Sequence, residues 1–234
     1  MSIYEMIRIG GAEPVARRPV GLACSRLNPN SAEDRYALAA ALDEGCDLVE
    51  VADFAAAGRT EAMVGAEVKG RPAAPALMVR FGVLCDPMGR QVGVDLRPRA
   101  VKTWLGYSLA RLGGAQIDLY VPAAPDPRVP IEDTAGAVGE MIDAGFAGAF
   151  GLANAGAATI RRAHTVRQVA AVAIDARVMG LQAAEAARRQ ADAIGALVVE
   201  TGGVSSLSDA PGRRIRRLLD PRAYLAEARE TALA

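Results

Sequence analysis

Three charged side chains stand within or directly after apolar stretches that are typical of buried strands. Glu50 lies inside one such stretch, Asp53 follows it, and Arg80 lies near the end of the next. Side chains alternate between the two faces of a strand, so Glu50 and Arg80 are expected to point to the same side of a sheet. We expect them to form a charged pair that orients an anionic or enolisable substrate, with Asp53 as a further acid–base group. The competing interpretation is an inert ion pair.

Four more polar residues follow later apolar stretches. Asn154, Asp175, Arg177 and Glu200 all lie at or just beyond the expected ends of strands. Barrel enzymes carry their active sites at the carboxyl ends of the strands, so we predict that these four residues bind substrate. The competing interpretation is ordinary loop solvation or helix capping.

Other reactive side chains are interpreted as structural. His164, the only histidine, falls in an expected helix, which favours a surface or packing role. Cys24 and Cys85 have no accompanying histidine, so neither is expected to be a nucleophile. Three cysteines without paired spacing indicate neither a disulfide framework nor a metal site. A basic cluster is taken as a solvated face, with an acidic partner or anionic substrate as the alternative: Arg213, Arg214, Arg216 and Arg217.

The elements that position these residues alternate regularly. The expected strands are Val20–Cys24, Leu48–Ala52, Ala76–Phe81, Gln116–Val121, Gly148–Leu152, Val169–Ile174 and Ala196–Glu200. The expected helices between them are Ser31–Glu44, Arg99–Leu112, Ile131–Ala144, Ala157–Val166 and Ala183–Ile194. Strands that alternate with helices predict right-handed βαβ units and a parallel sheet. Seven such units favour a (β/α) TIM-type barrel over a doubly wound sheet.

The barrel is expected to be incomplete. No apolar run after Glu200 could supply an eighth strand, and Asp220-Pro221 opens a last helix. We therefore predict a barrel over residues 1–210 and a helical tail over 211–234 that packs on the barrel or on a second subunit. A missing strand would leave two unpaired edges, so we also predict a homodimer that covers them.

Composition narrows the class of protein. The chain of 234 residues has 27 basic and 27 acidic residues, and 51% of it is hydrophobic. Charge balance argues against a nucleic-acid partner. No apolar run approaches the ~20 residues that span a bilayer, and the first residues lack the pattern of a signal peptide, so we expect a cytoplasmic protein without membrane contact.

Short motifs appear in one consistent order over about residues 1–205. They include Ala52-Asp53, Gly58-Arg59-Thr60-Glu61, Arg80-Phe81-Gly82, Ile117-Asp118-Leu119-Tyr120, Pro125-Asp126-Pro127, Gly151-Leu152-Ala153-Asn154 and Thr159-Ile160-Arg161-Arg162-Ala163-His164. This ordered set resembles the aldo-keto reductase superfamily. The resemblance implies a (β/α) barrel that transfers hydride from a nicotinamide cofactor to a carbonyl, with a tyrosine as the proton donor.

The residues that the resemblance places in the catalytic tetrad differ from those of the family. The family's Asp falls on Glu50, its Tyr on Ala55, its Lys on Arg80 and its His on Ala123. A methyl group cannot donate a proton, and Arg does not replace Lys in geometry or acidity. We therefore expect the family's tetrad to be absent.

The positions that the resemblance assigns to the cofactor are also altered. The family's Ser-Asn pair reads Ala153-Asn154, and its Gln and stacking Tyr fall on Ala173 and Ala176. The segment after the seventh strand reads Thr201-Gly202-Gly203-Val204, and the family's phosphate-binding eighth strand is expected to lie beyond the end of this sequence. We therefore predict no cofactor and no metal.

These observations lead to one functional reading and two alternatives. The reading is a redox-inactive barrel that catalyses dehydration, isomerisation or cyclisation of a small carbonyl metabolite in a bacterial biosynthetic pathway. One alternative is a pseudoenzyme that binds a ligand or a partner enzyme. The other is an NADPH-dependent reductase.

Overall fold

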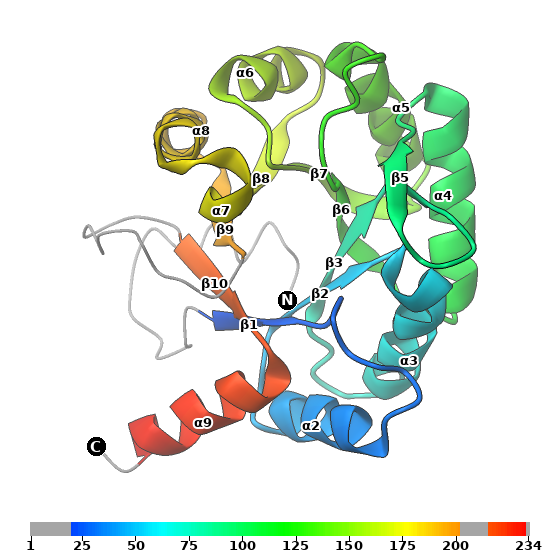
Figure 1. The fold of residues 1–234 in the computed structure, drawn as a ribbon, viewed down its shortest axis with the longest axis vertical. Coiled ribbons are helices and arrows are strands. Elements are labelled where there is room, and N and C mark those ends of the chain that lie inside the picture. Colours follow the sequence, from blue (N-terminus) through cyan, green and yellow to red (C-terminus); the bar gives the residue numbers. More distant parts are fainter. Residues whose placement is uncertain (1–19, 202–214, 233–234) are drawn as a thin grey trace.

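The apolar runs form the inner wall of a closed parallel barrel. The computed structural model describes residues 20–201 and 215–232. Eight strands pair in the order β1-β10-β9-β8-β7-β6-β3-β2 and close on themselves (Figure 1). They are β1 Val20–Ala23, β2 Leu48–Ala52, β3 Ala76–Phe81, β6 Ile117–Pro122, β7 Ala147–Ala153, β8 Val169–Ile174, β9 Leu197–Glu200 and β10 Ile215–Leu219. The predicted TIM-type (β/α) architecture and its first seven strands are confirmed.

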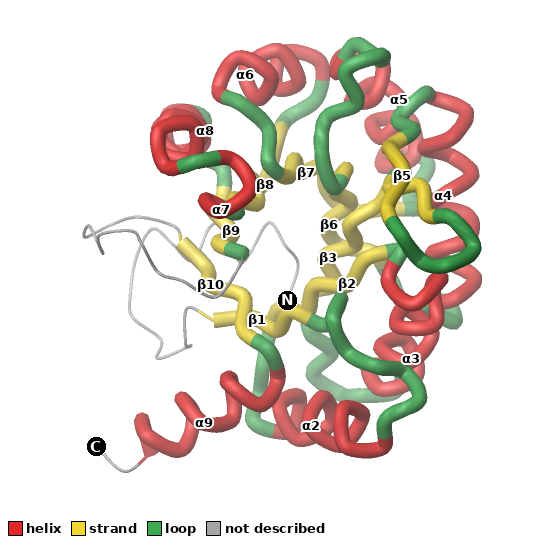
Figure 2. Tube along the Cα trace, viewed as in Figure 1, coloured by secondary structure: helices red, strands yellow, loops and turns green. Residues whose placement is uncertain are grey.

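Helices lie outside the ring of strands (Figure 2). They are α2 Ala32–Asp43, α3 Arg59–Val68, α4 Pro98–Arg111, α5 Ile131–Asp143, α6 Ala157–Val166, α7 Ala176–Met179, α8 Leu181–Ala193 and α9 Pro221–Ala232, with a short turn η1 Ala55–Gly58 before α3. Helix α2 begins as its sequence predicts, because the Ser31 side chain accepts a hydrogen bond from the Asp34 amide. Helix α3 was not expected. It packs closely on the chain after α4, since a Cβ on Gly65 would come within 2.6 Å of the Leu112 carbonyl oxygen.

The prediction of a missing eighth strand is wrong. β10 occupies the place between β1 and β9 and pairs in parallel with both. The sequence does not indicate this strand, because two arginines interrupt its apolar run. Arg216 forms a two-bond ion pair with Asp47, at 2.8 and 3.2 Å, and Arg217 pairs with Glu227 of α9 at 2.8 Å. Carboxylate partners therefore let a strongly charged segment complete the barrel.

Closure by β10 changes two further expectations. The barrel extends past residue 210, so the boundary predicted there does not hold. Of the predicted tail, helix α9 is the described part that lies outside the barrel. It lies beside α2 (Figure 1), and its Arg222 pairs with Glu33 and Asp34. Because β1 and β9 are both paired, the argument for a homodimer from open strand edges is lost.

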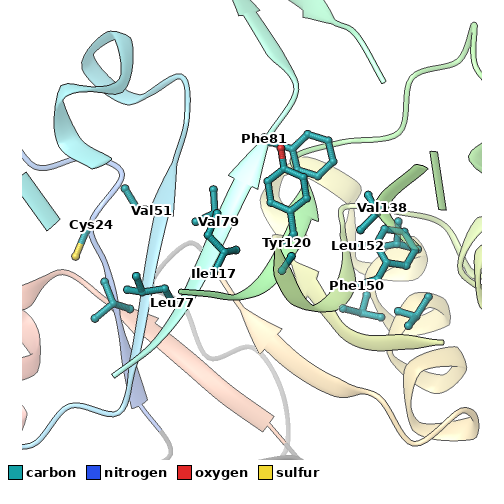
Figure 3. Close-up of a cluster of buried hydrophobic side chains, with 14 of the residues drawn as sticks. Cys24, Val51, Leu77, Val79, Phe81, Ile117, Tyr120, Val138, Phe150 and Leu152 are labelled. Atoms are coloured by element: carbon teal, nitrogen blue, oxygen red, sulfur yellow. The ribbon is translucent and has the colours of Figure 1, made fainter. Parts of the chain in front are cut away.

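The core has two layers, as strand alternation requires. Side chains such as Leu48, Met78 and Leu119 fill the inside of the barrel. The alternate side chains face the helices, and Figure 3 shows Tyr120 of β6 stacked on Phe81 of β3, with ring centroids 3.9 Å apart. The packed interior leaves the carboxyl ends of the strands as the place for a site.

One insertion departs from the βα repeat. Between β3 and α4 the chain forms an antiparallel hairpin, β4 Val83–Cys85 and β5 Gln91–Val94. The hairpin carries the exposed Met88 and Val92. A cavity of about 450 Å³ lies beside it and is lined by residues that include Trp104.

Candidate active site

A cavity of about 340 Å³ opens at the carboxyl ends of the strands. Its lining combines residues from β1, β2, β3, β10 and the segments that follow β1, β8, β9 and β10: Ala23, Ser25, Arg26, Glu50, Arg80, Asp175, Arg177, Thr201, Leu218, Leu219, Asp220 and Ala223. A larger cavity of about 480 Å³ lies at the opposite end of the barrel and includes Gly113 and Asp118. We assign the candidate site to the cavity of about 340 Å³ and call it the mouth pocket. It brings charged residues together at the carboxyl ends of the strands, where barrel enzymes carry their active sites.

The floor of the mouth pocket holds a buried ion pair. The Nε of Arg80 donates to Oε1 of Glu50 at 2.5 Å, and Glu50 is 1% exposed. The Oγ of Ser25 donates to the same carboxylate oxygen at 2.6 Å, and Arg80 Nη2 lies 3.5 Å from that Oγ. Within the described part of the chain, Oε2 of Glu50 and Nη1 of Arg80 make no hydrogen bond. These two atoms are therefore available to a bound molecule.

Ser25 was missed by the sequence analysis. It lies in the turn after β1, where the Leu27 amide donates to the Cys24 carbonyl at 3.0 Å. A serine two residues past a strand carries no distinctive pattern of its own. Only the closeness of β1 and β2, seen in the bond from the Cys24 amide to the Glu50 carbonyl, brings it to Glu50.

Asp175 and Arg177 form a second neutral pair at the rim of the mouth pocket. Both carboxylate oxygens of Asp175 accept from Arg177, at 3.1 Å from Nε and 3.0 Å from Nη2. This ion pair lowers the pKa of Asp175, because the guanidinium stabilises the charged carboxylate. Asn154 supports the same loop through its Oδ1, which accepts from the Asp175 amide at 3.0 Å. It is not among the residues that line the pocket.

Asp53 lies outside the mouth pocket in a buried cluster with Glu61 and Arg111. Its Oδ2 accepts from the Gly82 amide at 3.3 Å, while Oδ1 is buried without a partner. Arg111 Nη1 donates to the Asp53 carbonyl at 3.2 Å and to Glu61 Oε2 at 3.0 Å. Burial raises the pKa of Asp53 to about 7. The negative charge of Glu61 adds to this effect, while the hydrogen bond from the Gly82 amide opposes it.

The structure corrects the position predicted for Glu200. Leu197 and Val199 of β9 face the inside of the barrel, so Glu200 faces outward. It is 7% exposed, and its Oε1 lies 3.7 Å from Nη2 of the buried Arg188 on α8. It does not line the mouth pocket. We withdraw it as a substrate-binding residue.

The remaining reactive residues have structural roles. His164 Nδ1 accepts from the Val169 amide at 3.2 Å. Cys24 is buried, and burial raises its pKa well above the ordinary value, which disfavours the thiolate. Arg213 and Arg214 lie outside the described residues. Within the described part, no cluster of His, Cys, Asp and Glu could hold a metal ion, and no helix has the length and hydropathy to cross a bilayer.

Comparison with known proteins identifies the family. Residues 20–194 match the model of the Aldo/keto reductase family, and the chain belongs to it. It is 32% identical over 163 residues to an aldo-keto reductase of Schizosaccharomyces pombe named yakc, whose name specifies NADP(+); the match covers 67% of this chain and 48% of that protein. It is also 32% identical over 164 residues to the aldo-keto reductase str7 of Strobilurus tenacellus, covering 66% and 46%. The chain thus spans about half the length of the curated relatives it matches.

Solved structures agree on the fold. An aldo-keto reductase from Bacillus halodurans in its holo form has a TM-score of 0.72 at 17% identity, covering 91% of this chain and 86% of that one. An aldo-keto reductase from Klebsiella pneumoniae in complex with NADPH has a TM-score of 0.68 at 15% identity, covering 90% and 84%.

The positions on which the resemblance places the family's Tyr and His carry only methyl groups. Ala55 and Ala123 are 6% and 7% exposed. Ala55 begins η1, in which Ala56 and Ala57 both adopt left-handed backbone angles with φ of 47° and 55°. A run of two such residues is strained, because the Cβ atom crowds the following carbonyl. The backbone at this place is unusual while its side chains carry no acid.

The described residues of the mouth pocket do not fit a nicotinamide dinucleotide. No aromatic ring lines the described pocket to stack on a nicotinamide, and its volume is at the lower end of the range for drug-sized ligands. The start of α9 after the eighth strand does not offer its amides to a phosphate, because Oδ1 of Asp220 accepts from the Arg222 amide at 2.9 Å. The Asp220 carboxylate would also repel a phosphate there.

Proposed function

We propose that this member of the family catalyses a cofactor-independent acid–base step on a small carbonyl metabolite, of the kind that dehydration, isomerisation or cyclisation requires. The observation that supports the proposal is the Glu50–Arg80 pair, which faces the mouth pocket. The resemblance places the family's Tyr and His on Ala55 and Ala123, which cannot donate a proton. A specialised bacterial biosynthetic pathway and a cytoplasmic location remain part of this proposal.

The proposed mechanism uses the two atoms of the pair that are open to the pocket. Oε2 of Glu50 takes a proton from the carbon beside the carbonyl, and the C–H electron pair moves to form an enolate. Arg80 Nη1 donates a hydrogen bond to the enolate oxygen as its negative charge develops. Arg80 keeps its own proton throughout, because a guanidinium is not deprotonated in proteins.

The enolate then has two balanced outcomes. If the substrate carries a C=C bond next to the acidic carbon, the enolate extends over that bond, and return of the proton from Glu50 to its far end gives the conjugated isomer, with Glu50 again a carboxylate. Loss of a hydroxyl from the next carbon gives an unsaturated carbonyl, with the Glu50 proton leaving in the water that forms. Ser25 holds Oε1 in both outcomes, which leaves Oε2 as the base. Asp175 and Arg177 form the wall that contacts substrate, and Asn154 positions their loop. Asp53, predicted as a catalytic residue, does not line the pocket and has no step in this mechanism.

An NADPH-dependent reductase is the second candidate. It is favoured by a relative at 32% identity whose name specifies NADP(+). A pseudoenzyme that binds a ligand or a partner enzyme is the third.

The homodimer remains a prediction, although paired strand edges no longer argue for it. Light scattering at micromolar concentration tests it, and a monomer would contradict it.

The decisive experiment follows solvent deuterium into simple ketones by NMR. We expect the wild-type protein to exchange protons beside the carbonyl without any cofactor. Glu50→Gln should lower the exchange rate by at least about a hundredfold, the range of a general base. The matched control is Glu132→Gln, at a two-bond surface pair with Arg162 between α5 and α6. Equal rates in wild type and Glu50→Gln would refute the proposal.

A further inference from the structure

The described residues that line the mouth pocket include two charges without a partner among them. Among its lining residues, Glu50 pairs with Arg80 and Asp175 pairs with Arg177. Two charged residues are left. Within the described part of the chain, Arg26 has no carboxylate and Asp220 has no side-chain cation at ion-pair distance. The two are also too far apart to pair with each other, although both line the same cavity.

Arg26 is attached to a rigid part of the structure. It lies in the turn after β1 between Cys24 and Leu27, which are 0% and 4% exposed. The bond from the Leu27 amide to the Cys24 carbonyl, at 3.0 Å, closes the turn. The guanidinium therefore extends from a fixed point beside Ser25, and among residues 20–201 and 215–232 it has no hydrogen-bond acceptor.

Asp220 is fixed in a comparable way. It directly follows β10, the neighbour of β1, and its Oδ1 accepts from the Arg222 amide at 2.9 Å as the cap of α9. Its backbone carbonyl accepts from the Tyr224 amide. A capping bond to one carboxylate oxygen leaves the negative charge in place and the other oxygen open.

The geometry points to a zwitterionic carbonyl compound as the ligand class, with a carboxylate bound by Arg26 and an ammonium group bound by Asp220. This inference rests on the proposed function, since it places the carbonyl at Glu50 and Arg80. A simple anion would be attracted by Arg26 but repelled by Asp220. A simple cation would be attracted by Asp220 but repelled by Arg26. Only a ligand with both charges complements both residues, which is how charged pockets discriminate.

The test uses three ketones with related skeletons and different charges. They are 5-aminolevulinate with both groups, levulinate with only the carboxylate, and 1-amino-2-butanone with only the amine. Calorimetric titration of the full chain should give the tightest binding for 5-aminolevulinate. Arg26→Gln should weaken that binding about three- to fivefold, the effect of losing one exposed ion pair, and remove the advantage over the amine. Asp220→Asn should weaken it similarly and remove the advantage over levulinate.

Both variants are expected to fold. Arg26 is exposed, and asparagine caps helices as well as aspartate does. Matched controls are Arg90→Gln, at an exposed pair on the hairpin, and Asp43→Asn, at an exposed pair with Arg71. Neither control should change the order of the three ligands.

Two results would overturn the inference: no binding of 5-aminolevulinate by the wild type, or an order of affinities that the two variants leave unchanged. Proton exchange measured on the same samples separates this inference from the proposed function. Exchange that depends on Glu50 without a charge preference would remove only the ligand class. A charge preference without exchange would support the ligand class and remove the acid–base step.

Discussion

Asp53 provides a test of the electrostatics that is independent of any substrate. Its pKa of about 7 lies about three pH units above the ordinary 3.8, and burial is the main cause. Each pH unit corresponds to ~1.36 kcal/mol, so holding the ionised carboxylate in the folded state costs about 4 kcal/mol. Because Asp53 is only 5% exposed, solvent screening reduces this figure little.

The sign of the pH effect follows from the raised pKa. A carboxyl with a raised folded-state pKa contributes stability that is present at low pH and lost as pH rises through that value. The wild-type protein should therefore lose up to about 4 kcal/mol from this group between about pH 4 and above pH 7. Asp53→Asn should lose none of it, since its amide oxygen can still accept from the Gly82 amide.

The assay is urea unfolding followed by the fluorescence of Trp104, the only tryptophan, at a series of pH values. We expect Asp53→Asn to be more stable than wild type above pH 7 and close to it near pH 4. Asp86→Asn is the control of opposite sign, because hydrogen bonds from Arg90 lower the pKa of Asp86. Parallel pH profiles for wild type and Asp53→Asn would refute the reasoning.

Three further predictions concern stability, each measured by the same unfolding assay. Arg80→Met should lower the free energy of unfolding by about 3 kcal/mol, because it leaves a buried carboxylate without its cation; adding Glu50→Gln should restore most of the loss, and no restoration would contradict the pair. Ala57→Gly should leave stability unchanged or raise it by up to about 1 kcal/mol, since glycine relieves the left-handed strain; a clear loss would show that the turn is unstrained. Arg216→Ala should cost about 2 kcal/mol by removing the two bonds to Asp47, and a neutral effect would contradict its role in holding the eighth strand.

Much of the fold could be predicted because most strands of a parallel barrel are buried on both faces. Runs such as Val169–Ile174 are continuous apolar segments between helices. Such a segment can be recognised as a strand without knowing which strands pair with it. The eighth strand lacks the pattern, because Arg216 and Arg217 interrupt its apolar run. Their partners, Asp47 far away in sequence and Glu227 on the following helix, become visible only in the structure. Helix α3 was missed because Gly65 interrupts its apolar stripe, and the need for a glycine arises from the close approach of Leu112.

The candidate site was only partly predictable for a similar reason. Alternation along β2 and β3 was enough to point Glu50 and Arg80 into the barrel. Alternation along β9 also gives two opposite faces, but only the structure shows that Val199 faces inward and Glu200 outward. Ser25, Arg26 and Asp220 follow strands that are neighbours only once β10 closes the ring, so their meeting in one pocket could not be predicted before that strand was found.

The central claim is that this barrel moves protons and not hydride. The most direct measurement incubates the wild-type chain with a ketone and NADPH in deuterated water and follows the ketone by NMR. We expect deuterium on the carbons beside the carbonyl, at a rate that NADPH does not change and that Glu50→Gln lowers by at least about a hundredfold. Formation of the alcohol with matching oxidation of NADPH would contradict it.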